Sequence, residues 1–364
     1  MFILLACVIS FFFAANIGAS GAAASMGIAY GSGVVKSKKN ALLFCAIGIF
    51  LGATIGGGNV AKTISSGIVP ENTISIYIAL IILASAAISL FFANLSGIPL
   101  STSEVTVGAI VGVGIAYQAL FIKTLAVIIM FWILVPLIAF LLAYAANSVI
   151  KIIRQKYPFL SKEKSTKVLA ILVILTGFFE AFSSGMNNVA NAVGPIIAAG
   201  IINIHEGMLF GGMVVALGAY FLGANVIETN GKRITDLSLL QGTAVSGIGG
   251  ILVIIASIFG IPIPHTQVTT CSILGIGASD KGKELWKKAI VVKLIKTWVI
   301  SPVFSLVISY NLVKIFIYFD FSGIAVLFLF IVFVYVISQW KPSKNQPVRA
   351  KKIVTKNTGG NYCE

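Results

Sequence analysis

Asn187, Asn188 and Asn191 stand within five residues of one another in an otherwise apolar stretch that Gly194 and Pro195 close. An amide in such a stretch is costly unless it faces protein or a polar cavity. At helical spacing Asn187 and Asn188 each share a face with Asn191, so their N–H groups can converge. Converging amides can bind an anion by donating hydrogen bonds. The alternative is hydrogen bonding between helices, which the small neighbouring residues would permit.

A second set of donors is predicted at two GIP motifs, which begin residues 97–114 and 260–277. Each motif places a proline in an apolar region, and proline removes a donor and disfavours helix at the residue before it. Polar residues follow, among them the Ser and Thr that favour helix N-caps. Each motif therefore predicts an unwound stretch and a helix start, whose free N–H groups suit an anion; the alternative is a loop between ordinary helices. The anion contacts expected here are Ser101, Thr102, Ser103, His265, Thr266 and Gln267.

The two GIP motifs belong to a longer internal repeat. Residues 97–114 and 260–277 are identical at eight of 18 positions without a gap. Residues 52–68 match 218–234 at seven of 17 positions. A membrane chain built from two copies of one unit is typical of secondary transporters, whose substrate site lies between the copies.

The composition excludes an ordinary soluble domain, in which about a quarter of residues are charged. The chain is 58% hydrophobic and 10% charged, with a mean hydropathy of +1.02. Its continuous apolar stretches favour spanning helices over a β-barrel. We therefore expect an all-α polytopic membrane protein with about 11 transmembrane segments. They are predicted at 2–34, 40–67, 73–96, 102–121, 124–150, 167–201, 206–228, 238–259, 264–279, 286–313 and 320–340.

The net charge of +15 lies mostly in loops, which indicates membrane topology and no nucleic-acid binding. Because basic loops stay cytoplasmic, we expect the N-terminus outside and the C-terminus inside; the alternative for residues 1–35 is a cleavable signal peptide. Five segments in the first copy then make the second copy enter from the opposite side, as an inverted-topology repeat with broken or re-entrant helices. The expected units are a first repeat (1–150), a cytoplasmic basic linker (151–166), a second repeat (167–313), an extra transmembrane helix (314–340) and a polar basic tail (341–364).

These motifs resemble the inorganic phosphate transporter (PiT) family, whose signature is similar to G-x-N-D-x-A-N-x-x-G-P in both halves. The likeness covers residues 1–313 and is closest to a branch of that family, the CysP-type bacterial sulfate permeases. It implies an inverted-repeat symporter that carries a tetrahedral oxyanion across a bacterial or archaeal plasma membrane.

The departures from the family pattern concern acidic residues. The signature aspartate is Asn188 in the second copy, and the Asn–Asp pair is Ser20 and Gly21 in the first. At a position where the family has a glutamate, the first copy has Lys62, and the second copy keeps the glutamate as Glu228. Sulfate only accepts hydrogen bonds, whereas protonated phosphate benefits from an acceptor. The lost aspartates favour sulfate, with Ser20 among the lining residues, although Glu104 could still serve phosphate.

The scarcity of carboxylates also bears on coupling, because sodium prefers oxygen ligands with carboxylates nearby. We expect proton symport with Glu104 or Glu228 as the proton site, since burial lets a carboxyl take up a proton. The alternative for Glu228 is an ion pair with Lys62, which could instead face the anion. Glu180 is expected to be structural, near a helix start within the sixth segment. His265 suits proton transfer or a polar cap equally.

The expected function is secondary active import of sulfate by proton symport with alternating access. The alternatives are a sodium- or proton-coupled phosphate symporter and a passive anion channel. A nucleotide-driven pump is disfavoured. Residues 277–283 nearly match the motif of a phosphate-binding loop, but Glu284 follows where that motif requires Ser or Thr. Two histidines and scattered cysteines argue against an enzyme. The expected partners are the anion, the lipid bilayer and a coupling ion, for which the proton is preferred over sodium. A homodimer is left open, and no cofactor or metal is expected.

Overall fold

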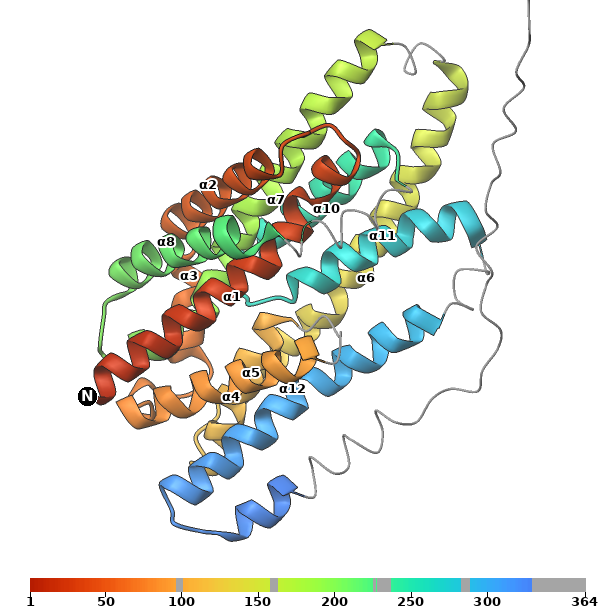
Figure 1. The fold of residues 1–364 in the computed structure, drawn as a ribbon. Coiled ribbons are helices and arrows are strands. Elements are labelled where there is room, and N and C mark those ends of the chain that lie inside the picture. Colours follow the sequence, from red (N-terminus) through yellow and green to blue (C-terminus); the bar gives the residue numbers. More distant parts are fainter. Residues whose placement is uncertain (96–100, 158–162, 225–226, 228–236, 283–288, 329–364) are drawn as a thin grey trace, which may run out of the picture.

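The computed structural model describes residues 1–95, 101–157, 163–224, 227, 237–282 and 289–328, and in them the chain is helical without strands (Figure 1). This confirms the predicted all-α fold. Most of the last predicted segment, the tail and Glu228 lie outside the described residues. The long helices are α1 (Phe2–Gly31), α2 (Lys38–Gly56), α4 (Ile76–Leu95), α5 (Thr102–Ala116), α6 (Ile122–Lys156), α7 (Glu163–Ala198), α8 (Ile204–Leu222), α10 (Leu239–Ile258), α11 (His265–Lys281) and α12 (Ala289–Phe316).

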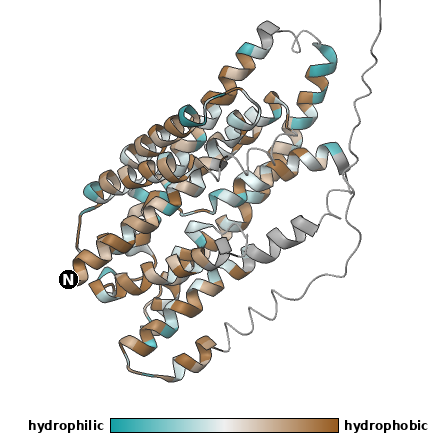
Figure 2. Ribbon diagram, in the orientation of Figure 1, coloured by the Kyte–Doolittle hydropathy of each residue, from teal (hydrophilic) through white to brown (hydrophobic). Residues whose placement is uncertain are grey.

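The outer surface of the helices is apolar, as a lipid-facing surface must be. Among the described residues, six helices are long and apolar enough to cross a membrane, and three shorter apolar helices accompany them. On α6 the side chains of Ile133 and Leu141 are 66% and 55% exposed. Figure 2 shows hydrophobic residues along the helices, with hydrophilic residues gathered towards several helix ends. The precise number of eleven spans stays a prediction.

The order of helices repeats, and the packing exchanges between the two copies. Helices α1, α2, α4, α5 and α6 are followed by α7, α8, α10, α11 and α12 in the same order. Helix α1 packs on α8, and its counterpart α7 packs on α2. In the same way α5 packs on α12, and α11 packs on α6. This exchange supports the predicted repeat, while the opposite membrane orientation of the copies stays a prediction.

Glycines bring α7, which carries the asparagines, into backbone contact with α2. A Cβ atom on Gly52 would lie 1.8 Å from the Phe182 carbonyl oxygen, and one on Gly185 would lie 2.0 Å from that of Ile49. Such small-residue contacts are how membrane helices approach closely.

The second predicted segment, 40–67, differs from the single span expected. Helix α2 ends at Gly56, and a short helix α3 (Gly58–Lys62) and the π-helical turn η1 (Thr63–Gly67) follow it. Glycine lacks a Cβ and is costly inside a helix, which is a physical reason for the break at Gly56 and Gly57. A 3-10 turn, η2 (Glu71–Thr73), then leads to α4.

Candidate functional site

Both GIP motifs lead to helix starts, as the sequence predicts. Helix α5 begins at Thr102 with Ser101 in the N-cap position, and α11 begins at His265 after Pro264. Neither start has a side-chain cap hydrogen bond, whereas α8 and α10 both begin with a full capping box. An uncapped start keeps N–H groups available to another acceptor. Residues 97–100 of the first motif lie outside the described residues.

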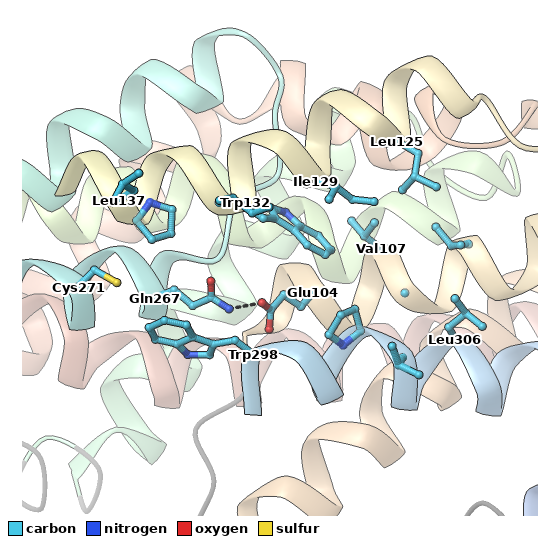
Figure 3. A pocket seen from close by; sticks show the side chains of 16 residues that line it. Glu104, Val107, Leu125, Ile129, Trp132, Leu137, Gln267, Cys271, Trp298 and Leu306 are labelled. Carbon is cyan, nitrogen blue, oxygen red and sulfur yellow. Dashed lines mark hydrogen bonds between the residues drawn. The ribbon is translucent and has the colours of Figure 1, made fainter. Parts of the chain in front are cut away.

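The two starts meet through equivalent positions of the repeat. Glu104 and Gln267 are each the eighth residue of their 18-residue match. The side-chain amide of Gln267 donates a hydrogen bond to Glu104 Oε1 (Figure 3). The repeat predicts that the two helix starts face one another, and the hydrogen bond between Gln267 and Glu104 brings their first turns together.

The hydroxyl groups of the α5 start contact the amides of α7. Asn191 Nδ2 donates to Ser103 Oγ at 3.0 Å and to Thr102 Oγ1 at 3.3 Å. Thr102 Oγ1 donates to Asn188 Oδ1 at 3.4 Å, and Asn188 Nδ2 donates to Ser184 Oγ at 3.0 Å. Asn188 is 7% exposed and Asn191 is fully buried, so these amides are shielded from solvent, whereas Thr102 is half-buried. A hydroxyl bond as long as 3.4 Å is weak, and its donor can turn to a better acceptor.

Asn187 serves a different purpose in this conformation. Its amide nitrogen donates to Ser257 Oγ at 2.9 Å and to the Ile261 carbonyl at 3.0 Å. Its oxygen accepts from the Ile263 N–H at 3.0 Å and from Ser103 Oγ at 3.5 Å. These bonds tie the turn between α10 and α11 to α7, which is the structural alternative that the sequence left open for these amides.

The other predicted residues are less closely grouped. Ser20 is exposed on α1, and its hydroxyl donates to the Ile17 carbonyl of the same helix. Ser101 is buried and Thr266 half-buried. Lys62 is exposed at the end of α3, and its predicted partner lies outside the described residues. The structure thus groups the α5 start with α7 and leaves Ser20 and Lys62 outside that cluster.

Glu180 does not lie near a helix start, and that expectation is wrong. It lies inside α7, fully buried, seven residues before Asn187. Seven residues are almost two helical turns, so both residues occupy one face of α7. Glu180 Oε1 accepts from Thr269 Oγ1 at 2.7 Å and lies 3.6 Å from His265 Nε2. That face, with Ser184 between, is the sequence signal that could have linked Glu180 to the asparagines.

A cavity of about 580 Å³ lies among α5, α6, α11 and α12 (Figure 3). Its walls are mainly apolar and include Trp132 and Trp298, while Glu104 and Gln267 supply polar groups. Apolar walls do not suit a dianion, which needs hydrogen-bond donors. Glu104 faces this cavity. Its neighbour Ser103 instead contacts the amides of α7.

Comparison with known proteins agrees with this architecture. Residues 17–309 match the family described as Phosphate transporter family. Sulfate permease CysP of Bacillus subtilis (strain 168) is 54% identical over 324 residues, which cover 89% of this chain and 91% of that protein. A probable low-affinity inorganic phosphate transporter of the same organism is 31% identical over 279 residues, covering 72% and 82%.

A solved structure titled the sodium-dependent phosphate transporter shares the fold. Its TM-score is 0.72 at 24% sequence identity, over 85% of this chain and 98% of that chain. The relatives are transporters and permeases and not enzymes. The chain, with its membrane-spanning helices and its match over most of its length, therefore belongs to the phosphate transporter family, as a multi-pass membrane transporter of anions.

Proposed function

We propose that this protein imports sulfate across the plasma membrane by proton symport with alternating access. The observation that carries the proposal is the meeting of donors between α5 and α7. The hydroxyls of Thr102 and Ser103 and the amides of Asn188 and Asn191 lie within hydrogen-bond reach of one another. The uncapped start of α5 adds backbone N–H groups and a partial positive charge to them.

Sulfate fits this donor set better than phosphate does. Sulfate has no proton to donate, so a site made of hydroxyl, amide and backbone donors satisfies it. Asn188 stands where the family pattern has an aspartate, which removes a negative charge beside the anion. Glu104, the carboxylate nearest in sequence to the donors Thr102 and Ser103, lines the apolar cavity and not the donor cluster. The name of the 54% identical relative, a sulfate permease, points the same way.

Symport with a cation offsets part of the charge that the anion carries, and the scarcity of carboxylates favours a proton over sodium. An inside-negative potential opposes anion entry by about 2.3 kcal/mol per charge per 100 mV. A proton carried with the anion offsets part of this energy. The acidic candidates named from the sequence are Glu104, which is buried, and Glu228, which lies outside the described residues.

Alternating access is proposed because the amides of the donor cluster are buried in this conformation. With Asn187 and Asn191 fully buried, an anion enters only when one group of helices moves against another. We place the N-terminus outside and the C-terminus in the cytoplasm, from the distribution of basic loops.

The test is uptake of labelled sulfate and labelled phosphate by proteoliposomes that contain the purified protein. We expect sulfate to accumulate when the lumen is more alkaline than the bath, with no requirement for sodium. Uptake that follows a sodium gradient and ignores pH would reject proton coupling. Faster uptake of phosphate than of sulfate would favour the phosphate symporter, and equilibration without uphill accumulation would favour the channel.

A further inference from the structure

A buried acid and a buried imidazole face each other across the contact between α7 and α11. Glu180 is fully buried and His265 is 3% exposed. Glu180 Oε1 lies 3.6 Å from His265 Nε2 and accepts a hydrogen bond from Thr269. Glu180 Oε2 and His265 Nε2 have no hydrogen-bond partner. Two unpartnered polar atoms at such depth, one acidic and one basic, are unusual in a packed interior.

We propose that Glu180 and His265 together form the site that binds the transported proton. The inference rests on the proton symport proposed above and deepens it, because it assigns the proton to a pair that the sequence did not connect. The pair lies on the face of α7 that also carries Asn187, at a separation of roughly 10 Å along the helix axis. A proton at the pair and an anion at the amides would therefore occupy neighbouring places on one helix.

The surroundings of Glu180 contain no permanent cation among the described residues. From α11 it meets His265 and Thr269, and from α2 the thiol of Cys45 faces it. From α10 it meets Gly249, where a Cβ atom would lie 3.2 Å from Glu180 Oε1. Neither α1 nor α10 contains a charged residue. A proton is thus the positive charge that can balance the carboxylate.

One proton makes the pair electrically neutral in either of two forms. It can sit on Glu180 beside a neutral imidazole, or on His265 as an ion pair with the carboxylate. Without that proton the carboxylate is a buried charge with no partner of opposite sign, which is strongly unfavourable.

The same contact connects the proton to the anion site. Helix α11 packs mainly along α6 and meets α7 near its own start. There His265 faces Glu180, and the N–H of Ile263, two residues earlier, is held by Asn187. Loss of the proton therefore weakens the docking of the α11 start on α7. Because the donor cluster uses the same docked arrangement, proton binding and anion binding should strengthen each other, which is the linkage that symport requires.

Glu104 is the rival proton site named from the sequence, and it is the other buried carboxylate in this part of the fold. Gln267 donates to it, and it lines the apolar cavity on the side away from α7. Glu104→Gln and Glu180→Gln are the same chemical change at similar burial. They differ in which helix contact they alter.

The first experiment measures proton uptake when sulfate binds to the purified full-length protein in detergent, with a pH indicator in weak buffer. We expect about one proton per bound sulfate for the wild type and for the control Asp280→Asn, whose carboxylate lies at the other end of α11, and almost none for Glu180→Gln. Loss of proton uptake in Glu104→Gln with normal uptake in Glu180→Gln would assign the proton to Glu104 instead. Normal proton uptake by Glu180→Gln would overturn the assignment. So would loss of sulfate binding in this variant, because Glu180 would then serve the anion site or the fold. A wild type that binds sulfate without a proton would instead contradict the proposed symport.

The second experiment compares pH-driven uptake with sulfate exchange in proteoliposomes. Exchange of internal for external sulfate needs no net proton movement, so Glu180→Gln should keep exchange and lose accumulation driven by a pH gradient. Thr269→Val removes the hydroxyl donor that stabilises the Glu180 carboxylate, so the pH at half-maximal uptake should rise. An unchanged midpoint in Thr269→Val, or full pH-driven accumulation in Glu180→Gln, would contradict the assignment.

Discussion

The two helix starts that follow the GIP motifs occupy the same place in the repeat, yet they make different contacts with α7. At the start of α5, hydroxyl groups of Thr102 and Ser103 meet the amides of α7. At the start of α11, an imidazole meets the carboxylate of Glu180. The backbone device is the same in both, a proline-led start without a side-chain cap. The side chains that follow it therefore decide the chemistry, with donors at one start and a titratable group at the other.

In the contact between the two helix starts, the two copies contribute different side chains. Glu104 and Gln267 are equivalent in the repeat, and one accepts the hydrogen bond that the other donates. Two glutamates at this place would repel each other unless one held a proton. The amide in the second copy lets the starts meet without that requirement, which is consistent with a proton site elsewhere.

The largest effect is expected from Asn187→Ala, which removes the amide that ties the turn between α10 and α11 to α7. The change leaves the Ile261 carbonyl and the Ile263 N–H buried without their partner. Each unsatisfied buried group costs about 1–3 kcal/mol. We expect a clearly lower melting temperature when thermal unfolding is followed with a thiol-reactive dye or by calorimetry. The matched control is Asn40→Ala on the exposed start of α2. An unchanged melting temperature for Asn187→Ala would argue that Asn187 binds substrate and does not hold the fold.

The next effect in size concerns the donors at the first start. Asn188→Ala removes the amide that meets Thr102 and Ser184, on the face of α7 that we assign to the anion. We expect uptake of labelled sulfate to fall to background while the melting temperature stays near that of the wild type. Normal uptake would remove Asn188 from the site and weaken the contrast between the two starts.

A smaller loss is expected when the hydroxyls alone are removed. Thr102→Ala combined with Ser103→Ala takes away two donors to a charged ligand, each worth about 1.5–3 kcal/mol. We therefore expect sulfate affinity, measured by calorimetry, to fall by at least about a hundredfold. Thr266 is the counterpart of Ser103 in the repeat. Thr266→Ala should cost less than Ser103→Ala alone, because no hydrogen bond joins its hydroxyl to an amide of α7 among the described residues. Equal losses at both starts would mean that the starts share the anion.

The sequence predicted local features well and long-range contacts less well. Proline marks the helix starts at Thr102 and His265, and Ser101 stands at the N-cap position of the first, because these preferences act within a few residues. The break at Gly56 was missed because an apolar glycine stretch also fits a continuous span. The pairing of Glu180 with His265 joins residues 85 positions apart, and only the docking of α11 on α7 brings them together. Ser20 was included because it stands where the family pattern has an asparagine, and that position does not say which way a side chain points.

The smallest effect is expected at the other end of α11, where Asp280 joins three helices. It accepts hydrogen bonds from Asn147 at 2.8 Å and from Gln241 at 3.1 Å, and Lys151 Nζ lies 3.0 Å away. Partial burial raises the pKa of Asp280, but hydrogen bonds from Asn147, Lys151 and Gln241, together with the Lys151 charge, lower it overall. A carboxyl with a lowered pKa stabilises the fold above its unfolded pKa, near 3.9, and this contribution disappears as pH falls through the folded value.

Asp280→Asn should therefore lower stability slightly at neutral pH and by less as the pH drops below about 4. Because Asp280 and Lys151 are both more than a third exposed, solvent screening keeps the difference within about 1 kcal/mol. Melting temperatures of the variant and the wild type between pH 3 and pH 7 measure it. The variant should keep the pH dependence of sulfate uptake, since the proton pair lies at the opposite end of α11. A shifted uptake profile in Asp280→Asn would mean that the two ends of this helix titrate as one unit, and the contrast between its start and its end would no longer hold.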